Sequence, residues 1–323
     1  MPDTLNALVK TIRFEADDVI SIELLPAPGV VFPRFDAGSH IDLHLPNGLV
    51  RNYSLLNSTD EVGRYVVGVL KDRASRGGSR CVHEQLRVGM LLPIAAPSNN
   101  FRLHEDAGHS VLVAGGIGIT PILCMVKRLK TLGRSFELLY FARSRKSAAF
   151  IDQIEALGVT VTWHFDDEKG VPPDLQAMLA QRPPPSATGA ETHYYACGPA
   201  VMLDAFERSC AALGYANAHI ERFAAVAVDA AKDAKTSYTA VLGKSGRTFT
   251  ITPDKSLLAT LIDGGVDVDS SCEEGVCGTC ETRVLEGLPD HRDSVLSAAE
   301  RASNKVMMVC VSGCKSERLV LDL

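Results

Sequence analysis

"SSCEEGVCGTC" (residues 270–280) holds three of the nine cysteines of this 323-residue chain. Four residues separate Cys272 from Cys277, and two residues separate Cys277 from Cys280. If Cys310 supplies a fourth thiol, the whole spacing is C-x4-C-x2-C-x29-C. Three thiols on one short loop need a common partner, which is a metal ion, an iron–sulfur cluster or other cysteines.

A disulfide framework and a zinc site are two ways to use these thiols. Disulfide frameworks belong to small secreted chains. This chain is long, has an odd number of cysteines and begins MPDTLNALVK, without the basic start and apolar core of a signal peptide. We therefore expect free thiols and a reducing, cytoplasmic location. Structural zinc usually takes two short cysteine pairs, or cysteine pairs with histidine pairs, and here only His291 lies near the single C-x2-C.

The third alternative, a [2Fe–2S] cluster, fits the spacing best. C-x4-C-x2-C followed by a distant cysteine is the plant-type ferredoxin pattern. Two irons need four thiolates, and one loop that wraps the cluster can deliver three of them. Gly275 and Gly278 have no Cβ, so the backbone amides beside them can approach the sulfurs. The sequence therefore favours the cluster over zinc, and zinc over disulfides.

Length, composition and charge limit the class of protein. A chain of 323 residues predicts two or three domains. Apolar residues make up 46% and charged residues 22%, which is an ordinary globular balance. The sequence contains no run of about 18 apolar residues, so no membrane span is predicted. The net charge of −6 argues against nucleic acid as a partner.

Negative charge is concentrated around the cysteine loop. One interpretation is an ordinary solvated face. The other is a docking surface for a basic partner protein, because complementary charge speeds encounter. The acidic residues nearest the loop are Asp267, Asp269, Glu273, Glu274 and Glu281.

Hydrophobic patterning divides the chain into three domains and a linker. Residues 1–104 consist mainly of short predicted strands with turns, which is typical of a small antiparallel barrel. Residues 105–224 alternate strands and helices, as in a doubly wound α/β layer. Residues 225–237 are small and polar and are predicted to form a linker. Residues 238–323 contain the cysteine loop and form the cluster domain.

The strongest single helix prediction lies in the second of these domains. "TPILCMVKRLKTLG" (120–133) has Thr120 as the expected N-cap, Pro121 in the first turn and Gly133 as the stop. Further predicted elements are strands at 40–48, 49–56, 64–71, 110–116, 136–142, 159–165, 193–198 and 218–223, and helices at 79–87, 146–157 and 200–213.

Two motifs in the first domain point to an anion. In "RNYSL" (51–55), the strand period of two places Arg51 and the aromatic face of Tyr53 on one side. In "KDRASRGGSR" (71–80), two glycines precede the helix at 79–87, whose N-terminus attracts an anion. Each motif alone is most simply an exposed strand or a solvated basic loop; together they favour a flavin phosphate.

Two strand ends in the second domain point to a dinucleotide. "GGIGITP" (115–121) joins a strand to a helix, although Pro121 stands where the full glycine fingerprint has its third glycine. "ACGP" (196–199) follows a later strand. Ligands of open α/β sheets bind at the carboxyl ends of strands, so two such turns favour a dinucleotide over plain connections.

These motifs in this order, with "ERF" (221–223) and the cysteine spacing, resemble the ferredoxin–NAD(P)+ reductase superfamily. The C-terminal ferredoxin is similar to the branch of phthalate dioxygenase reductase and vanillate O-demethylase reductase. The resemblance covers nearly the whole chain. It implies an antiparallel β-barrel flavin domain, a doubly wound nucleotide domain and an α+β β-grasp plant-type ferredoxin domain.

The resemblance also implies roles for individual residues. Those with a part in catalysis would be Ser54 near flavin N5, Cys197 beside the nicotinamide, and Glu221 and Phe223, the aromatic covering the other flavin face. FMN would contact Arg51, Tyr53, Ser54, Gly77, Gly78 and Ser79; NADH would lie against Gly115, Gly116, Gly118, Thr120, Pro121, Cys197, Gly198 and Pro199; the cluster would be held by Cys272, Cys277, Cys280 and Cys310.

Two departures leave alternatives. Arg143 and Arg145 follow the strand at 136–142, where NADH-specific relatives often place an acidic residue, and arginine there can accept the 2′-phosphate of NADP. The branch prefers NADH, so NADH is expected, with Arg143 at its ribose. Cys314 is a second candidate for the fourth cluster ligand.

The implied function is electron transfer. NADH gives two electrons at once, a [2Fe–2S] cluster takes one, and the flavin between them divides the pair. The expected acceptor is the Rieske oxygenase of an aromatic catabolic system. The reductase itself is expected to be a monomer. A cytochrome P450 is an alternative acceptor. A zinc-stabilised, non-enzymatic binding module is an alternative of another class, which a visible spectrum would distinguish.

Overall fold

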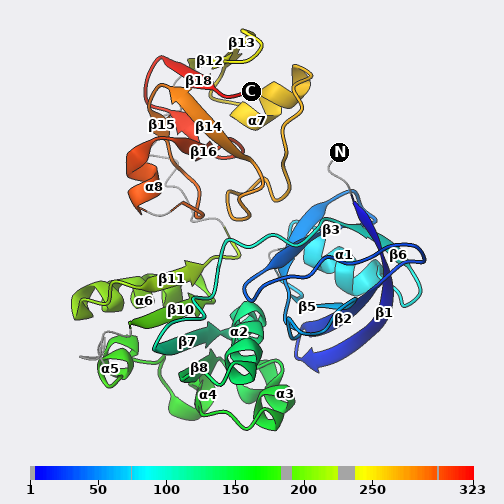
Figure 1. Ribbon diagram of the computed structural model, residues 1–323, viewed down its shortest axis with the longest axis vertical. Helices are drawn as coiled ribbons and strands as arrows, with labels where there is room; N and C mark the ends of the chain where they lie inside the picture. Colours follow the sequence, from blue (N-terminus) through cyan, green and yellow to red (C-terminus); the bar gives the residue numbers. More distant parts are fainter. Residues whose placement is uncertain (1–3, 74, 183–190, 225–236, 297) are drawn as a thin grey trace. The chain divides into compact units, whose positions relative to one another are not determined.

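The computed structural model describes residues 4–73, 75–182, 191–224, 237–296 and 298–323 (Figure 1). The chain divides into two compact units, Pro2–Glu221 and Arg222–Leu323. Nearly all of the predicted linker, residues 225–236, lies outside the described residues. Among the helices that are described, none has the length and apolar character needed to cross a membrane.

The first part of the larger unit is an antiparallel barrel. Its six strands follow the order β4-β3-β6-β1-β2-β5. A bridge between Leu55 and Val67 joins the end of β4 to β5 and closes the sheet. The predicted barrel is therefore present, with the predicted helix beside it. The elements are β1 (Leu5–Ala16), β2 (Val19–Pro26), β3 (His40–His44), β4 (Val50–Ser54), β5 (Tyr65–Leu70), α1 (Gly78–Gln85) and β6 (Leu91–Ile94).

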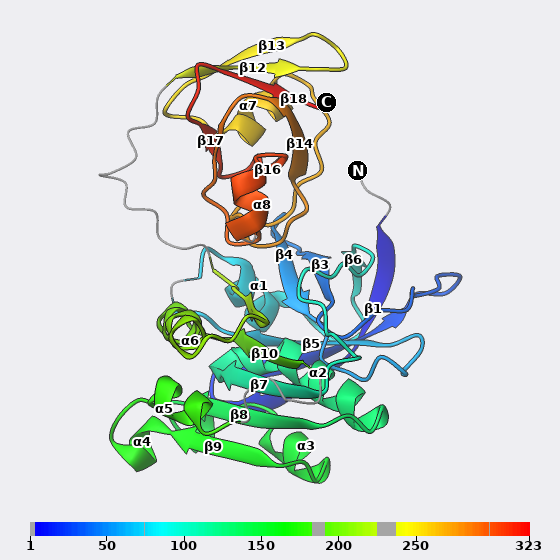
Figure 2. The same cartoon turned by 60° about the vertical axis from the view of Figure 1, so that its left-hand side comes forward.

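The second part of the larger unit is a parallel sheet with helices on both faces. Its strand order is β11-β10-β7-β8-β9, and Figure 2 shows β10, β7, β8 and β9 side by side. The elements are β7 (His109–Gly115), η1 (Gly116–Gly118), α2 (Ile119–Thr131), β8 (Phe136–Ala142), η2 (Arg145–Ser147), α3 (Ile151–Ala156), β9 (Val161–Phe165), α4 (Asp166–Lys169), α5 (Leu175–Ala180), β10 (Thr192–Cys197), α6 (Ala200–Leu213) and β11 (Ala218–Glu221).

Alternate residues of β7 explain why both faces of this sheet are covered. Leu112 and Ala114 belong to the core that contains α2, whereas Val111 and Val113 belong to the core that contains α5 and α6. The strand order changes direction between β7 and β10, which is where ligands bind in doubly wound sheets. The doubly wound expectation is confirmed.

The start of α2 differs from the prediction. The helix begins at Ile119 with Gly118 as its N-cap, so Thr120 is already helical and the predicted cap is wrong. The reason is the preceding 3-10 turn at Gly116–Gly118: it winds the chain earlier, and the Thr120 hydroxyl donates back to the Ile117 carbonyl over 3.1 Å. Gly133 does end the helix region, with a positive φ of 63°.

The barrel and the parallel sheet pack against each other through α2. The Lys127 ammonium donates to the Leu56 carbonyl over 3.0 Å, and the Cys124 thiol donates to the Asn57 carbonyl over 3.2 Å. A Cβ on Gly68 of β5 would lie 2.7 Å from the Thr120 side chain. One hydrophobic core runs through both parts, which holds the ends of β4, β7 and β10 in fixed relation.

The smaller unit is a mixed sheet with two helices, as expected for a β-grasp ferredoxin. The strand order is β13-β12-β18-β14-β16, in which β12 and β18 are parallel. Ser256 caps α7 by accepting from the Ala259 amide over 3.1 Å. The elements are β12 (Tyr238–Leu242), β13 (Thr248–Ile251), α7 (Leu257–Asp263), β14 (Glu281–Glu286), β15 (Pro289–Asp290), α8 (Ala298–Ser303), β16 (Val306–Met308), β17 (Gly313–Cys314) and β18 (Arg318–Leu321).

Candidate functional site

The cysteine loop lies between α7 and β14, and its thiols are buried. Cys272, Cys277, Cys280 and Cys310 have exposed fractions of 3–7%. The Cys280 and Cys310 sulfurs lie 3.1 Å apart, although 30 positions separate the two residues. The fold therefore brings the downstream Cys310 to the loop that carries the other three thiols.

Hydrogen bonds favour the thiolate form at two of these cysteines. The Cys277 thiol and the amides of Gly275, Val276 and Cys277 lower the pKa of Cys272 to about 6. The neighbouring Cys310 lowers the pKa of Cys280. The same sulfur–sulfur hydrogen bonds raise the pKa of the partner thiols, Cys277 and Cys310. Amides directed at sulfur suit the thiolate ligands of an iron–sulfur cluster.

Gly275 shows why a side chain is excluded from this loop. It has a φ of 70°, in the left-handed region. A Cβ there would lie 2.6 Å from the Val311 side chain and 3.1 Å from Asp293 Cα. The loop is therefore closed by the segments after β15 and before β17, and the absence of a Cβ lets it approach them.

Cys314 makes contacts of a different kind. Its sulfur lies 3.1 Å from the Ser316 carbonyl and 3.1 Å from the Ser316 hydroxyl. The residue belongs to β17, which pairs with β15. These contacts favour a structural role for Cys314 and leave Cys310 as the better fourth ligand.

In the larger unit, the two anion motifs of the barrel meet. The Arg51 side chain of β4 lies against Gly78 at the start of α1, where a Cβ would lie 2.8 Å from Arg51 Cγ and Nε. Gly77 has a φ of 102°, and the Ser79 hydroxyl accepts from the Asp72 amide over 3.2 Å. A cationic side chain thus lies over a glycine turn at a helix N-terminus, which fits a phosphate group.

A cavity of about 330 Å³ lies beside this turn. Three cationic side chains line it, from residues Lys71, Arg73 and Arg80. Asp18, Asp72 and Ser75 complete the lining. Lys71, Asp72 and Ser75 were not predicted as site residues, although they lie in the quoted basic stretch. Asp18 was not predicted either, because it comes from the turn before β2 and no local signal marks it.

The two predicted dinucleotide turns are in direct contact. A Cβ on Gly118 would lie 2.2 Å from the Cys197 carbonyl oxygen. A Cβ on Gly115 would lie 2.8 Å from Pro199, and one on Gly198 would lie 3.0 Å from Gly115 Cα. The ends of β7 and β10 therefore form one narrow glycine-lined region, in which a flat ligand can approach the backbone.

The end of β11 lies next to both the barrel and β10. Cys197 and Glu221 are register partners, and the Ser54 hydroxyl of β4 lies 3.4 Å from Glu221 Oε2. The Glu221 carboxyl is partly accessible but lies deep among protein atoms, and this desolvation raises its pKa to about 8. Burial, followed by the neighbouring Glu221, also raises the pKa of the Cys197 thiol, so both groups hold their protons at pH 7.

For two further predicted residues, the structure shows no contact that bears on their predicted roles. Arg143 is exposed after β8, and its carbonyl accepts from the Asp167 amide over 3.0 Å. Phe223 is 40% exposed and belongs to the smaller unit. Their assignment to the NADH ribose and to the flavin face stays a prediction.

Comparison with known proteins supplies an independent view of the chain. A family described as "2Fe-2S iron-sulfur cluster binding domain" matches residues 240–315. The phenoxybenzoate dioxygenase subunit beta of Ectopseudomonas oleovorans is 48% identical over 98% of this chain and 96% of its own length. A vanillate O-demethylase oxidoreductase of a Pseudomonas species is 42% identical over 99% of this chain and its own full length (100%).

Solved structures similar to this chain cover the same, nearly full length of it. Phthalate dioxygenase reductase, described as a modular structure for electron transfer from pyridine nucleotides to [2Fe-2S], is 36% identical with a TM-score of 0.72 and covers 99% of this chain and 98% of its own. An intact type IV self-sufficient cytochrome P450 monooxygenase is 38% identical with a TM-score of 0.88 over 99% of this chain. This chain spans only 41% of that protein's length.

Proposed function

Because this chain belongs to the reductase family that includes phthalate dioxygenase reductase and the vanillate O-demethylase oxidoreductases, we propose that it delivers electrons from NADH to a terminal oxygenase. The observation that carries the proposal is the meeting of Cys280 and Cys310 at 3.1 Å within the matched cluster-binding region. FMN held by the barrel would supply the conversion of a two-electron donor, NADH, to a one-electron acceptor, the [2Fe–2S] cluster that Cys272, Cys277, Cys280 and Cys310 would hold.

The residues of the barrel would hold FMN. Arg51 and the turn at Gly77, Gly78 and Ser79 suit its phosphate, because a cation and a helix N-terminus converge there. Tyr53 follows Arg51 on the same face of β4 and offers an aromatic surface to the ring system.

The ends of β7 and β10 would hold NADH. The glycines there allow close backbone approach, and the buried Cys197 would lie at the nicotinamide end. Glu221 and Ser54 would exclude water and hold a proton beside the reacting ring, since the Glu221 carboxyl keeps its proton to about pH 8. The remaining residues assigned to this site are Gly115, Gly116, Gly118, Thr120, Pro121, Arg143, Gly198 and Pro199, and Phe223 is assigned to the other face of the flavin.

The partner would be a Rieske oxygenase of an aromatic catabolic system, docking at the acidic loop around the cluster. Glu273 is exposed and follows Cys272 in the sequence. A group of negative charges on a surface steers a positively charged partner towards it. The reductase would act as a monomer. A cytoplasmic location would suit its nine cysteines, all of which lie in the described residues and form no disulfide.

A cytochrome P450 is the second candidate acceptor. The likeness to the reductase part of a self-sufficient P450 monooxygenase favours it. Mixing the reduced protein with a Rieske oxygenase and with a separate P450 distinguishes the two, because electron delivery to one and not the other identifies the acceptor class.

The proposed electron path is tested by an anaerobic NADH titration of the holoprotein, followed by absorbance and electron paramagnetic resonance. We expect NADH to bleach the flavin band first and then to produce the signal of a reduced [2Fe–2S] cluster. A colourless protein, or a cluster that NADH leaves oxidised while the flavin is reduced, would contradict the path.

A further inference from the structure

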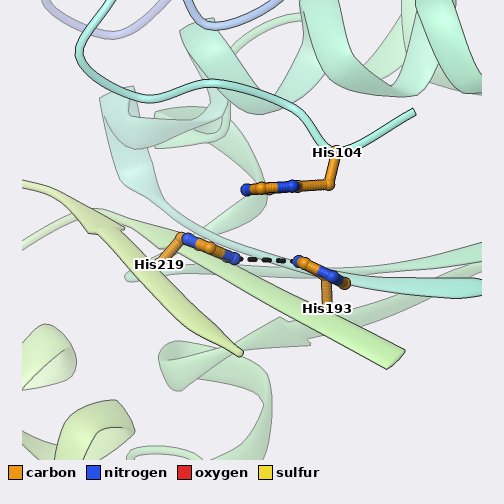
Figure 3. A group of neighbouring side chains, drawn as sticks. All are labelled: His104, His193 and His219. Atoms are coloured by element: carbon orange, nitrogen blue, oxygen red, sulfur yellow. Dashed lines mark hydrogen bonds between the residues drawn. The ribbon is translucent and has the colours of Figure 1, made fainter. Parts of the chain in front are cut away.

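Three histidines from separate segments meet on one face of the parallel sheet, and none of them is assigned to FMN or NADH. His193 lies on β10, His219 lies on β11, and His104 lies on the segment that leads from the barrel to β7. Figure 3 shows the His104 ring over the hydrogen bond that joins the other two rings. One ring nitrogen from each residue lies within 4.8 Å of the other two.

The fold holds these rings together by register and by a tether. Tyr195 pairs with His219 across β10 and β11, and His193 lies two residues before Tyr195, so its side chain is on the same face. The His104 amide donates to the Tyr195 hydroxyl over 2.9 Å. His193 Nδ1 lies 3.0 Å from His219 Nε2.

The charge state of the rings suits metal ligation. Burial, together with the neighbouring imidazoles, lowers the pKa of His193 and lowers that of His219 to about 4. Both rings are therefore neutral at pH 7, as a metal ligand must be.

A carboxylate stands on the far side of one ring. His193 Nε2 lies 4.0 Å from Glu191 Oε2, while His193 Nδ1 faces the other histidines. The same Glu191 oxygen accepts from the Asn217 amide group over 3.2 Å. A metal-bound histidine usually donates its second ring N–H to a carboxylate, which fixes the ring and increases its basicity. Glu191 is thus in position to support His193 as a ligand.

We propose that His104, His193 and His219 bind one divalent transition-metal ion of the zinc class, with a fourth position open to water. Three imidazoles are a common ligand set for Zn²⁺ and related ions. Zinc–nitrogen bonds of about 2 Å place tetrahedral ligand atoms about 3.3 Å apart. The His193–His219 pair is already near this separation. The His104 ring is stacked on both, with centroid distances of 4.4 Å and 5.0 Å, and because His104 is exposed its ring can turn to direct a nitrogen at the ion.

The ion would connect three parts of the larger unit. His104 follows the barrel, and the strands of His193 and His219 end at Cys197 and Glu221. Bound metal would therefore fix β10 and β11 to the segment that follows the barrel. It would raise the thermal stability of the unit with the logarithm of the metal concentration once that concentration exceeds the Kd. This consequence does not depend on the identity of the electron acceptor.

The test is a calorimetric titration of the oxidised holoprotein, with flavin and cluster fully loaded, using Zn²⁺ alone. We expect one Zn²⁺ per chain, a higher melting temperature with added Zn²⁺, and unchanged iron content. His104→Ala removes an exposed ligand and should weaken Zn²⁺ binding by at least about 100-fold. Glu191→Gln should weaken it by about 10- to 100-fold.

His44→Ala is the matched control, because His44 is another histidine of the larger unit but lies on β3, outside the cluster. It should bind Zn²⁺ like the unmodified protein. The proposal is overturned if the protein does not bind one Zn²⁺ per chain, or if the His104→Ala variant binds Zn²⁺ as tightly as the unmodified protein. It is also overturned if Zn²⁺ releases iron from the unmodified protein and from the variant alike.

Discussion

The Ser54 hydroxyl lies 3.4 Å from Glu221 Oε2, which joins the end of β4 to the end of β11 across 167 positions of sequence. This contact links the barrel to the parallel sheet at the point where the flavin and nucleotide sites are proposed to meet. Its carboxyl partner has a pKa raised to about 8 by burial.

Glu221 should make the stability of the larger unit depend on pH. The folded protein keeps this proton up to about pH 8, whereas the unfolded chain loses it near the ordinary value of 4.5. The contribution of Glu221 to stability is therefore present below about pH 4.5 and falls as the pH rises towards 8. Glu221→Gln cannot ionise, so its melting temperature should gain on that of the unmodified protein between pH 5 and 8. A constant difference across this range would contradict the raised pKa.

Gly118→Ala should damage NADH binding. The φ of Gly118 is −60°, which alanine adopts easily, but its Cβ would lie 2.2 Å from the Cys197 carbonyl oxygen and push the two strand ends apart. We expect the KM for NADH to rise at least about tenfold, or about 1.4 kcal/mol, measured with a small acceptor that oxidises the flavin. Gly313→Ala, whose Cβ would meet Arg292 at an ordinary 3.6 Å, is the control and should not change it.

The flavin released by heat should be FMN, one per chain, and not FAD. The phosphate site lies at the start of α1. Gly78→Ala should lower flavin content, because the new Cβ would lie only 2.8 Å from Arg51 Cγ and Nε and would displace that side chain. Chromatography of the released flavin and the flavin-to-protein ratio measure both effects. FAD in the extract, or full flavin content in the variant, would show that the site is assigned wrongly.

Cys310→Ser should abolish the cluster, whereas Cys314→Ser should keep it. The Cys310 sulfur lies 3.1 Å from the Cys280 sulfur, whereas the Cys314 sulfur contacts the Ser316 carbonyl. Iron and acid-labile sulfide content, with the visible spectrum, distinguish the variants. Loss of iron from the Cys314 variant alone would exchange the two roles.

Reversing Glu273 and Glu274 to Lys should slow electron delivery to the oxygenase. The effect should be larger at low salt, where the Debye length is roughly 30 Å at 0.01 M. Reduction of a small acceptor that takes electrons from the flavin should stay unchanged. A control reversal of Glu286 and Glu317 changes the charge equally outside the cysteine loop. Equal slowing by both pairs would refute a specific docking face.

Local features of the sequence predicted most of the elements. The helix at Ala200–Leu213 and the strand at Phe136–Ala142 have the predicted bounds, because apolar periodicity reports the buried face directly. The predicted N-cap of α2 was wrong because a 3-10 turn precedes the helix. Thr120 is a residue type that often caps helices, but here it lies inside the first turn.

The sequence by itself determined the cluster loop, since Cys272, Cys277 and Cys280 are held near one another by a few covalent bonds and two glycines. Tertiary structure decided what lies beside what. The contact of Ser54 with Glu221 and the meeting of His104, His193 and His219 depend on strand register and on the packing of the barrel against the sheet. These juxtapositions arise from hydrophobic burial summed over many residues, and no short motif near any one of the partners specifies them.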